Sequence, residues 1–170
     1  MPVYLIRHTD ALPLGQAGIK RDADRPLSDA GIHDLKALAP VLARLGFEPQ
    51  LFATSPLKRA LQTAELLMEH AGQKHAERVT CEELAPGGSA KKLVKFLRRH
   101  ADKDVALAGH APDIAEHTAY LIGDKTARIH FSKGAVACLE FEDDPAKAAG
   151  VLCWLITPDL CPHADAHRKE

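Results

Sequence analysis

The sequence predicts an α/β fold: a three-layer α/β/α sandwich with a mostly parallel central sheet and helices on both faces. Short apolar runs typical of buried strands alternate with longer segments of helical periodicity, and this alternation is typical of a parallel sheet. The last two apolar runs, at 135–141 and 151–156, have no helix between them. Because strands joined by a short polar loop are usually antiparallel, we expect an antiparallel strand pair at the C-terminal end.

A long polar segment separates the first strand from the first helix. We expect the strand at 3–7 and a loop at 11–27, which contains glycines, prolines and a charged run. Ser28 is a suitable N-cap for the helix. Pro40 has no N–H and is expected to kink or split the helix near Ala39. Apolar spacing predicts its buried face: Ile32, Leu35, Leu38, Leu42 and Leu45.

The second strand is expected at 50–54, and the chain then turns into a helix. Ser55 is predicted to cap this helix, with Pro56 at its first position, where a missing N–H does no harm. Arg59 follows within the first turns. Because cations are not favoured at the positive end of a helix dipole, the position of Arg59 indicates that it binds an anion.

Two further strand–helix pairs complete the parallel part of the sheet. A short strand is expected at 79–81, followed by a helix that Ser89 caps and that ends near Arg99. A fourth strand is expected at 104–108, followed by a helix at about 113–121. The chain thus passes four times from a strand into a helix or loop, and ligands bind at such junctions in open α/β sheets.

Length and charge limit the class of protein. With 170 residues, the chain can form one domain with its own core, which we place at 1–160, and a polar tail at 161–170. The formal net charge is −1, which argues against a general nucleic-acid or membrane surface. No segment resembles a signal peptide or approaches the ~20 apolar residues that span a bilayer. We therefore expect a cytoplasmic protein without nucleic-acid or membrane partners.

The four cysteines form no C-x-x-C pair, so the sequence predicts neither a zinc site nor a redox motif. Cys161, His163 and His167 could bind a metal in principle, but their polar neighbours indicate a frayed terminus instead. No metal and no cofactor are predicted. The other three cysteines lie in expected strands and are interpreted as small core residues: Cys81, Cys138 and Cys153.

Cationic and imidazole side chains follow three of the expected strands. Arg7 and His8 follow the first strand, Arg59 follows the second, and His110 follows the fourth. Because the carboxyl ends of parallel strands meet at one edge, we expect these side chains to converge. Two guanidinium groups and two imidazoles would suit a tetrahedral oxyanion, and one imidazole could act as a nucleophile. Taken singly, each could instead be an ordinary surface or turn residue.

The motifs, taken in order, resemble the histidine phosphatase superfamily. They are Arg7-His8, the Ser-Pro-x-x-Arg-Ala-x-x-Thr-Ala pattern at 55–64, and Gly109-His110. The short chain and the details Arg7-His8-x-Asp10-Ala11, Asp24-Arg25-Pro26-Leu27-Ser28 and Gly109-His110-x-Pro112 resemble its phosphohistidine phosphatase (SixA-type) branch. The resemblance extends from Val3 to about Pro158.

This resemblance implies a role for each motif residue. His8 would be the nucleophile and would form a phosphohistidine intermediate. Arg7, Arg59 and His110 would bind the phosphoryl oxygens, with His110 most useful as a cation. His8 must be neutral to attack, with one ring nitrogen free and the other held as N–H by an acceptor such as a backbone carbonyl.

Three other residues receive weaker assignments. The family's usual general acid is a carboxylate four residues before a glycine, and Glu83 matches this spacing to Gly87; Glu83 could instead be a solvated charge. Thr9 stands where the family usually has a small residue. Since a β-branched residue resists positive φ, we expect an ordinary backbone conformation there, with the hydroxyl facing the ligand. Lys133 could lie near the pocket.

The short chain bears on the substrate. Only 26 residues separate Glu83 from His110, and one helix and one strand account for most of them. An uncovered crevice could admit a phosphorylated side chain, and a P–N bond to histidine has an easily protonated leaving group. We therefore expect a phosphatase for protein phosphohistidine. The alternatives are a small-molecule phosphomonoesterase and a non-catalytic phosphate-binding or phosphoprotein-binding module. The sequence predicts no oligomeric state.

Overall fold

The computed structural model describes residues 1–123, 126–142, 145–146 and 149–161. The described strands form one six-stranded sheet in the order β3-β2-β4-β1-β5-β6. They are β1 (Pro2–Arg7), β2 (Leu51–Thr54), β3 (Glu77–Thr80), β4 (Val105–Gly109), β5 (Val136–Glu140) and β6 (Val151–Ile156). The described α-helices are α1 (Asp29–Arg44), α2 (Lys58–His70), α3 (Ala90–Arg98) and α4 (Asp113–Ile122).

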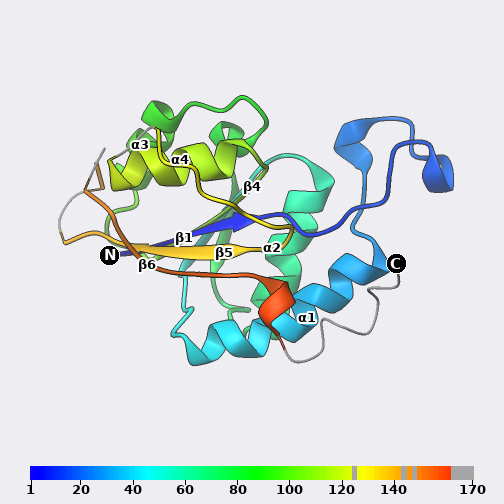
Figure 1. Cartoon of the computed structure of the whole chain (residues 1–170), viewed down its shortest axis with the longest axis horizontal. Coiled ribbons are helices and arrows are strands. Elements are labelled where there is room, and N and C mark those ends of the chain that lie inside the picture. The colour runs from blue at the N-terminus through cyan, green and yellow to red at the C-terminus, as the bar shows by residue number, and fades with distance from the viewer. Residues whose placement is uncertain (124–125, 143–144, 147–148, 162–170) are drawn as a thin grey trace.

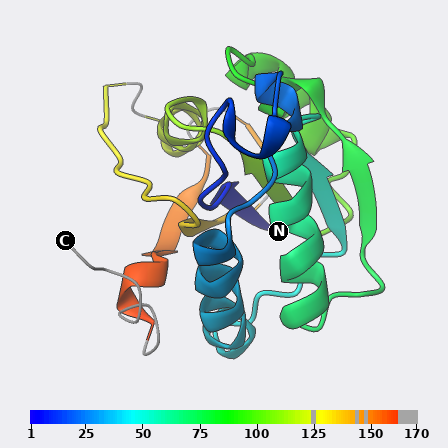
Figure 2. The same ribbon diagram turned by 90° about the vertical axis from the view of Figure 1, so that its right-hand side faces the viewer.

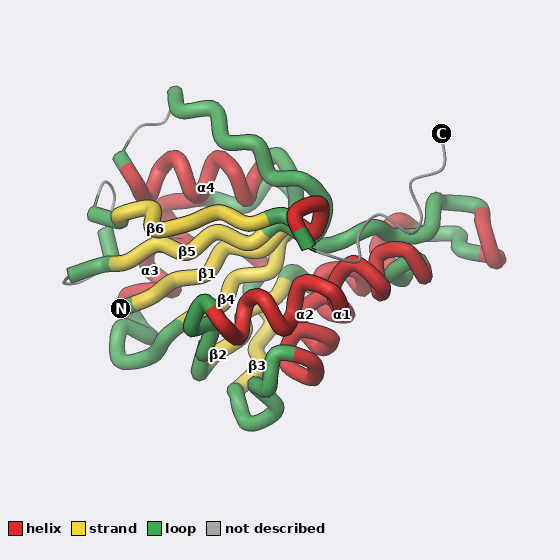
Figure 3. Tube along the Cα trace, turned by 60° about the horizontal axis from the view of Figure 1, so that its bottom comes forward, coloured by secondary structure: helices red, strands yellow, loops and turns green. Residues whose placement is uncertain are grey.

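The sheet is mostly parallel. Strands β3, β2, β4 and β1 pair in parallel, whereas β5 pairs antiparallel with β1 and β6 pairs antiparallel with β5. Figure 3 shows the strands of this sheet in yellow. The predicted antiparallel pair at the C-terminal end is therefore confirmed.

Helices cover both faces of the sheet because side chains of each strand alternate between two cores. In β1, Val3 and Leu5 belong to the core formed with α3 and α4, whereas Tyr4 and Ile6 belong to the core formed with α1 and α2. Figures 1 and 2 show the helices on the two sides of the sheet. The predicted three-layer α/β/α arrangement is confirmed.

The start of α1 follows the prediction, but its interior does not. The Ser28 hydroxyl accepts a hydrogen bond from the Gly31 amide at 3.1 Å and caps the helix. The expected split at Pro40 is wrong, because α1 continues from Asp29 to Arg44. Pro40 lies on the exposed side, while buried residues before and after it hold the helix on the core. Leu45, expected on the buried face, is exposed beyond the last turn.

The start of α2 also differs from the prediction. The helix begins at Lys58 with Leu57 as its N-cap, so Ser55 and Pro56 precede it. The Ser55 hydroxyl is hydrogen-bonded to the His110 ring at 2.8 Å and accepts from the Leu57 amide at 3.3 Å. The prediction that Ser55 caps this helix is therefore wrong. Ser55 instead lies in the loop that joins β2 to α2.

Smaller differences concern the cysteines and the third helix. Ser89 is the N-cap residue of α3, as expected, but its side chain makes no capping hydrogen bond.

Cys81 and Cys138 are buried, whereas Cys153 lies on β6, one of the two edge strands, and is exposed. Cys161, the first residue of the predicted tail, is buried in the core with α1. His163 and His167 lie outside the described residues.

The segment between β1 and α1, residues 11–27, extends past the carboxyl ends of the strands (Figure 1, dark blue). It contains two short 3₁₀ turns, η1 (Gln16–Gly18) and η2 (Asp22–Asp24), within the predicted loop. Its ends are joined by a bridge between Ala11 and Leu27. We call this segment the rim. Within the described part of the chain, no helix is long and apolar enough to cross a membrane.

Candidate active site

The carboxyl ends of β1, β4 and β2 place the main candidate residues side by side. Arg7 pairs in register with Gly109, and the His8 amide donates to the Gly109 carbonyl at 3.0 Å. The His8 and His110 rings consequently lie with their centroids 4.9 Å apart. Arg59 joins them from the first turn of α2 and is almost fully buried. We call this cluster of Arg7, His8, Arg59 and His110 the floor of the site.

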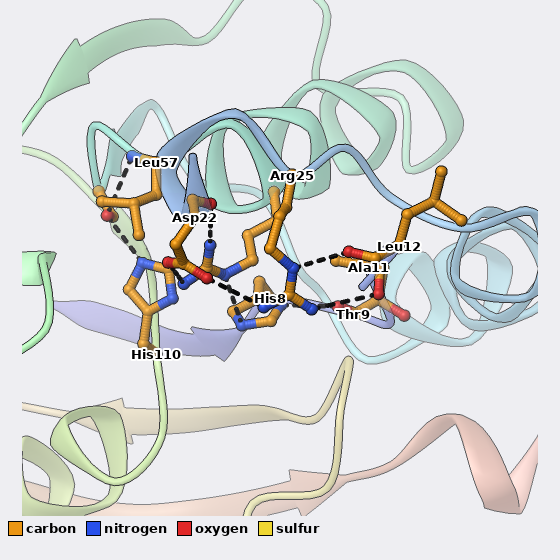
Figure 4. Close-up of polar contacts among 10 residues, drawn as sticks. His8, Thr9, Ala11, Leu12, Asp22, Arg25, Leu57 and His110 are labelled. Carbon is orange, nitrogen blue, oxygen red and sulfur yellow. Dashed lines mark hydrogen bonds and ion pairs between the residues drawn. The ribbon is translucent and has the colours of Figure 1, made fainter. Parts of the chain in front are cut away.

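Two hydrogen bonds define the tautomer of His8 (Figure 4). Its Nδ1 lies 2.6 Å from the Thr9 carbonyl oxygen, which can only accept, so Nδ1 carries the proton. Its Nε2 accepts from Nε of Arg59 at 3.2 Å, so Nε2 is unprotonated. Both contacts require the same neutral ring, with the lone pair of Nε2 directed toward the guanidinium group.

The surroundings of His8 keep this ring neutral. Its pKa is lowered to about 4, chiefly by burial and also by the positive charges of Arg59 and Arg7, although the hydrogen bond to the Thr9 carbonyl opposes this shift. A neutral imidazole with one free nitrogen is the form of histidine that can act as a nucleophile. At neutral pH the side chain is therefore in its reactive protonation state.

His110 is buried beside His8 and has one ring nitrogen without a partner. Ser55 accepts from the Leu57 amide and can therefore direct its own proton to Nε2 of His110. In that tautomer Nδ1 of His110 carries a proton, and this buried atom has no hydrogen-bond partner among the described residues. Burial, followed by the neighbouring His8 and Arg59, lowers the pKa of His110 to about 3. The expected cationic form therefore requires a bound anion.

Arg7 also has an unused donor. Its Nη1 donates to the Phe131 carbonyl at 2.7 Å, while its buried Nε has no partner among the described residues. Burial lowers the pKa of Arg7. Buried donors without partners are costly. An oxyanion that accepts from Arg7 and His110 would remove this cost.

Arg59 contacts both His8 and the rim. While its Nε donates to His8, its Nη1 donates to the carbonyl of Asp22 at 3.0 Å. Its Nη2 lies 3.0 Å from the carboxylate of the same residue. The Arg59 carbonyl accepts from the Thr63 hydroxyl at 2.8 Å, which fixes the first turn of α2. The anion partner expected for Arg59 is thus an aspartate of the chain itself in this structure.

Thr9 adopts an ordinary backbone conformation, as expected, because its φ is not positive. The expected orientation of its hydroxyl is wrong. That hydroxyl donates to the Gly31 carbonyl at 3.3 Å, and the residue is fully buried. Gly31 packs closely against it, since a Cβ at Gly31 would lie only 3.0 Å from Thr9 Cγ2. Thr9 therefore anchors the loop of His8 to α1.

Lys133 lies next to this loop. Its Nζ is 2.5 Å from Oδ1 of Asp10, whose Oδ2 accepts from the Ser28 hydroxyl at 2.6 Å. The neighbouring Gly134 amide donates to the His8 carbonyl at 3.3 Å. Lys133 thus connects the segment before β5 to the residues that follow His8.

Glu83 is not brought into this cluster. It lies in the 3₁₀ turn η3 (Glu82–Leu84), where its carbonyl accepts from Nε2 of the buried His117 at 3.2 Å. Its side chain lines a surface hollow together with Phe96 and Arg99 of the α3 region. Within the described residues, its carboxylate has no hydrogen bond or ion pair.

The rim supplies two charged residues that the sequence reasoning did not single out. Asp22 faces Arg59, and Nη1 of Arg25 lies 3.1 Å from the other carboxylate oxygen of Asp22. Arg25 is itself fixed by donation from Nε to the Leu12 carbonyl at 2.7 Å. The available signals were the acidic residues within the charged run and the Asp24-Arg25-Pro26 motif, neither of which shows which carboxylate faces the floor.

Metal binding can be judged for the described part of the chain. No cluster of three or more histidine, cysteine, aspartate or glutamate side chains is placed there so that it could hold a metal ion. The floor instead offers guanidinium and imidazole groups around an unprotonated ring nitrogen, Nε2 of His8, which accepts from Arg59. Chemically, this arrangement can bind a tetrahedral oxyanion and attack its central atom.

Comparison with known sequences gives two matches. The family model described as histidine phosphatase superfamily (branch 1) matches residues 3–88, about half of the chain, including Arg7, His8 and Arg59. An uncharacterized protein of Picosynechococcus sp. is 35% identical over 119 residues, which cover 68% of this chain and 70% of that protein.

Solved structures with a similar fold include two whose proteins differ in substrate. The protein histidine phosphatase SixA complexed with tungstate has a TM-score of 0.78 at 22% identity, covering 94% of this chain and 98% of that chain. The alpha-ribazole phosphatase from Shigella flexneri has a TM-score of 0.71 at 16% identity, covering 93% and 97%. At these identities, the likeness shows a shared fold.

Proposed function

The chain belongs to the histidine phosphatase superfamily, and we propose that it dephosphorylates phosphohistidine on a protein through a covalent intermediate on His8. The observation that carries the proposal is the state of the His8 ring. Its Nδ1–H is held on the Thr9 carbonyl, and its unprotonated Nε2 accepts from Nε of Arg59. An imidazole held in this way can attack phosphorus without first losing a proton.

The donors of the floor support binding of the transferred group. Phosphoryl transfer requires donors around three equatorial oxygens while the nucleophile attacks in line. We assign this role to Arg7, Arg59 and His110, the other members of the floor. Two of them hold buried donors without partners among the described residues, Nε of Arg7 and Nδ1 of His110. A bound phosphoryl group would satisfy both and would raise the pKa of His110.

Phosphohistidine suits this site because transfer to His8 then needs no proton donor. When the second ring nitrogen of the substrate carries a proton, the lone pair of His8 Nε2 forms the new N–P bond. The P–N bond of the substrate breaks, its electron pair stays on the substrate nitrogen, and a neutral imidazole leaves. One phosphoimidazolium replaces another, so charge is conserved. The position of Glu83, outside the floor, supports a reaction of this kind.

The second step restores the enzyme. A water oxygen bonds to phosphorus, the bond between phosphorus and Nε2 of His8 breaks, and its electron pair returns to Nε2. One proton of the water stays on its oxygen, and the other passes to another oxygen of the released phosphate. The neutral imidazole leaves as readily in this step as in the first, because His8 retains its proton on Nδ1.

A small-molecule phosphomonoesterase is the alternative, favoured by the structural likeness to an alpha-ribazole phosphatase. An alkoxide leaving group is much more basic than imidazole and depends on a placed general acid, an effect commonly worth roughly 10²–10⁴-fold. Glu83 would have to move into the floor to supply that proton. This requirement makes the alternative the weaker proposal.

The test compares kcat/KM for a histidine-phosphorylated protein with kcat/KM for a series of alkyl phosphomonoesters. We expect the phosphoprotein to be preferred, and acid-labile phosphate to be trapped on wild-type protein but not on His8→Ala. Preference for an alkyl ester would favour the alternative. Binding of phosphoprotein without turnover of it or of an aryl phosphate would leave only a phosphate-binding module.

A further inference from the structure

Asp22 places a negative charge at the edge of the floor. Its carboxylate lies 3.0 Å from Nη2 of Arg59, and its carbonyl accepts from Nη1 at 3.0 Å. The same guanidinium group donates from Nε to Nε2 of His8. One rigid, planar group therefore joins the Asp22 carboxylate to the nucleophile, and any phosphoryl group on His8 would lie close to this carboxylate.

The position of the carboxylate is fixed from a second side. Its other oxygen is 3.1 Å from Nη1 of Arg25, and Nε of Arg25 is held by the Leu12 carbonyl at 2.7 Å. Figure 4 shows Asp22 between His110 and Arg25. The hydrogen bond from Arg25 lowers the pKa of Asp22, so the carboxylate is ionised at neutral pH. The rim thus presents a fixed anion where an anionic substrate must bind.

We propose that Asp22 is a specificity-determining residue that disfavours simple phosphate esters and favours substrates whose leaving group carries a positive charge. The proposal rests on the proposed function. A second negative charge near the phosphoryl group opposes binding of any oxyanion. A protonated phosphohistidine ring offers a compensating attraction, because its cationic ring can lie against the carboxylate. An alkyl or aryl ester has no such charge.

The experiment substitutes Asp22→Asn, which removes the charge and keeps the carbonyl contact to Arg59 and the side-chain size. Three quantities are measured: inhibition by vanadate, kcat/KM for an aryl phosphate, and kcat/KM for a histidine-phosphorylated protein. We expect vanadate to bind more tightly and the aryl phosphate to react faster, each by about threefold or more, while the phosphohistidine reaction slows by about tenfold.

Asp24→Asn is the matched control. Asp24 lies in the same 3₁₀ turn and has the same charge, but its carboxylate is bonded to the exposed Arg21 at 2.6 and 2.8 Å. This variant is expected to leave all three quantities within about twofold of wild type, because exposed surface pairs contribute little. Equal changes in both variants would show an effect of net charge alone and would overturn the proposal.

The decisive result is that Asp22→Asn raises kcat/KM for the aryl phosphate and lowers kcat/KM for the histidine-phosphorylated protein. If both reactions slow equally in Asp22→Asn, Asp22 only holds Arg59, and the proposal is wrong. If the aryl phosphate alone slows, Asp22 is a proton donor, and the proposal is equally wrong. No change in any quantity also overturns it. The vanadate measurement requires no turnover, so tighter binding without any phosphohistidine activity would count against the proposed function but not against the electrostatic effect of Asp22.

Discussion

The floor of the site and the rim meet where Arg59 contacts Asp22, but they are held in place by different interactions. In the floor, His110 and Arg59 are 3% and 6% exposed, and Thr9 behind them is fully buried. In the rim, the side chain of Asp22 is 55% exposed and is held by arginines. The floor is fixed by strand register and buried hydrogen bonds, whereas the rim depends on ion pairs near solvent.

This difference separates two kinds of substitution. A change in the floor alters groups that any phosphoryl-transfer reaction on this fold would need, and it disturbs buried contacts. A change in the rim alters charge near the substrate at little cost in stability, because exposed ion pairs typically contribute about 1 kcal/mol or less. We therefore expect floor variants to lose activity on every substrate and rim variants to change which substrate is preferred.

The largest effect is expected from His8→Ala. If His8 is the nucleophile, as we propose, its removal abolishes the covalent route, so kcat should fall by at least about 10³-fold on every substrate while the protein remains folded. Single-turnover assays and circular dichroism measure the two quantities. Activity above a few per cent of wild type, with roughly normal KM, would mean that another group attacks phosphorus.

The two arginines that contact Asp22 allow a direct comparison between the regions. Arg59→Ala should weaken vanadate binding by more than about tenfold, because it removes a buried donor from the floor. Arg25→Ala should change it by less than about threefold, because Arg25 contacts the rim carboxylate rather than the anion. Calorimetric titration measures the vanadate affinity of both variants. Equal losses would remove the distinction between floor and rim.

Acid is expected to affect the floor only at a lower pH than it affects an ordinary histidine site. With its pKa lowered to about 4, His8 stays neutral down to mildly acidic pH, so the acid limb of kcat/KM should lie near pH 4. Removing the positive charge in Arg59→Ala should move this limb toward higher pH. A wild-type limb near 6.5 would show that His8 is not desolvated.

The same shift affects stability with a defined sign. Between about pH 4 and the unfolded value near 6.5, the unfolded chain binds more protons than the folded one. The free energy of unfolding should therefore fall as pH decreases through this window and show no contribution from His8 above it. Urea titrations at several pH values check this direction, and added vanadate should oppose the loss.

The smallest effect is expected from Glu83→Gln. Because the carboxylate lies outside the floor, kcat/KM for protein phosphohistidine should change by less than about threefold. Alkyl phosphomonoesters are measured in parallel. A loss confined to the alkyl esters and larger than about tenfold would mean that the η3 turn brings Glu83 to the leaving group as a general acid.

Much of the fold could be predicted from periodicity, because both faces of the sheet need apolar residues and each parallel strand needs a crossover. Convergence of Arg7, His8, Arg59 and His110 followed from the same argument, since residues after parallel strands share one edge. The continuous α1 could not be predicted from Pro40 alone, because packing on the core outweighs the loss of one hydrogen bond.

The remaining errors concern the direction of side chains. The spacing of Glu83 to Gly87 located the turn but not the carboxylate, whose direction follows from backbone contacts such as the bond from His117. The sequence predicts Ser55 as the cap of the helix that follows it. Its hydroxyl is instead hydrogen-bonded to His110, 55 residues away along the chain. Asp22 could not be chosen from its charged run, because only the tertiary contact with Arg59 distinguishes it from Asp24.

The seating of Thr9 has a consequence for how this sequence can diverge. Thr9 fits between Gly31 at the start of α1 and Gly134 before β5, and a Cβ at Gly31 would collide with the backbone of Asp10. A Cβ at Gly134, where φ is 78°, would lie 2.9 Å from Pro158 Cγ. Neither obstacle is the side chain of Thr9, so a smaller residue at position 9 would not free Gly31 or Gly134 to change. Both glycines are therefore required by the backbone that surrounds the loop of His8.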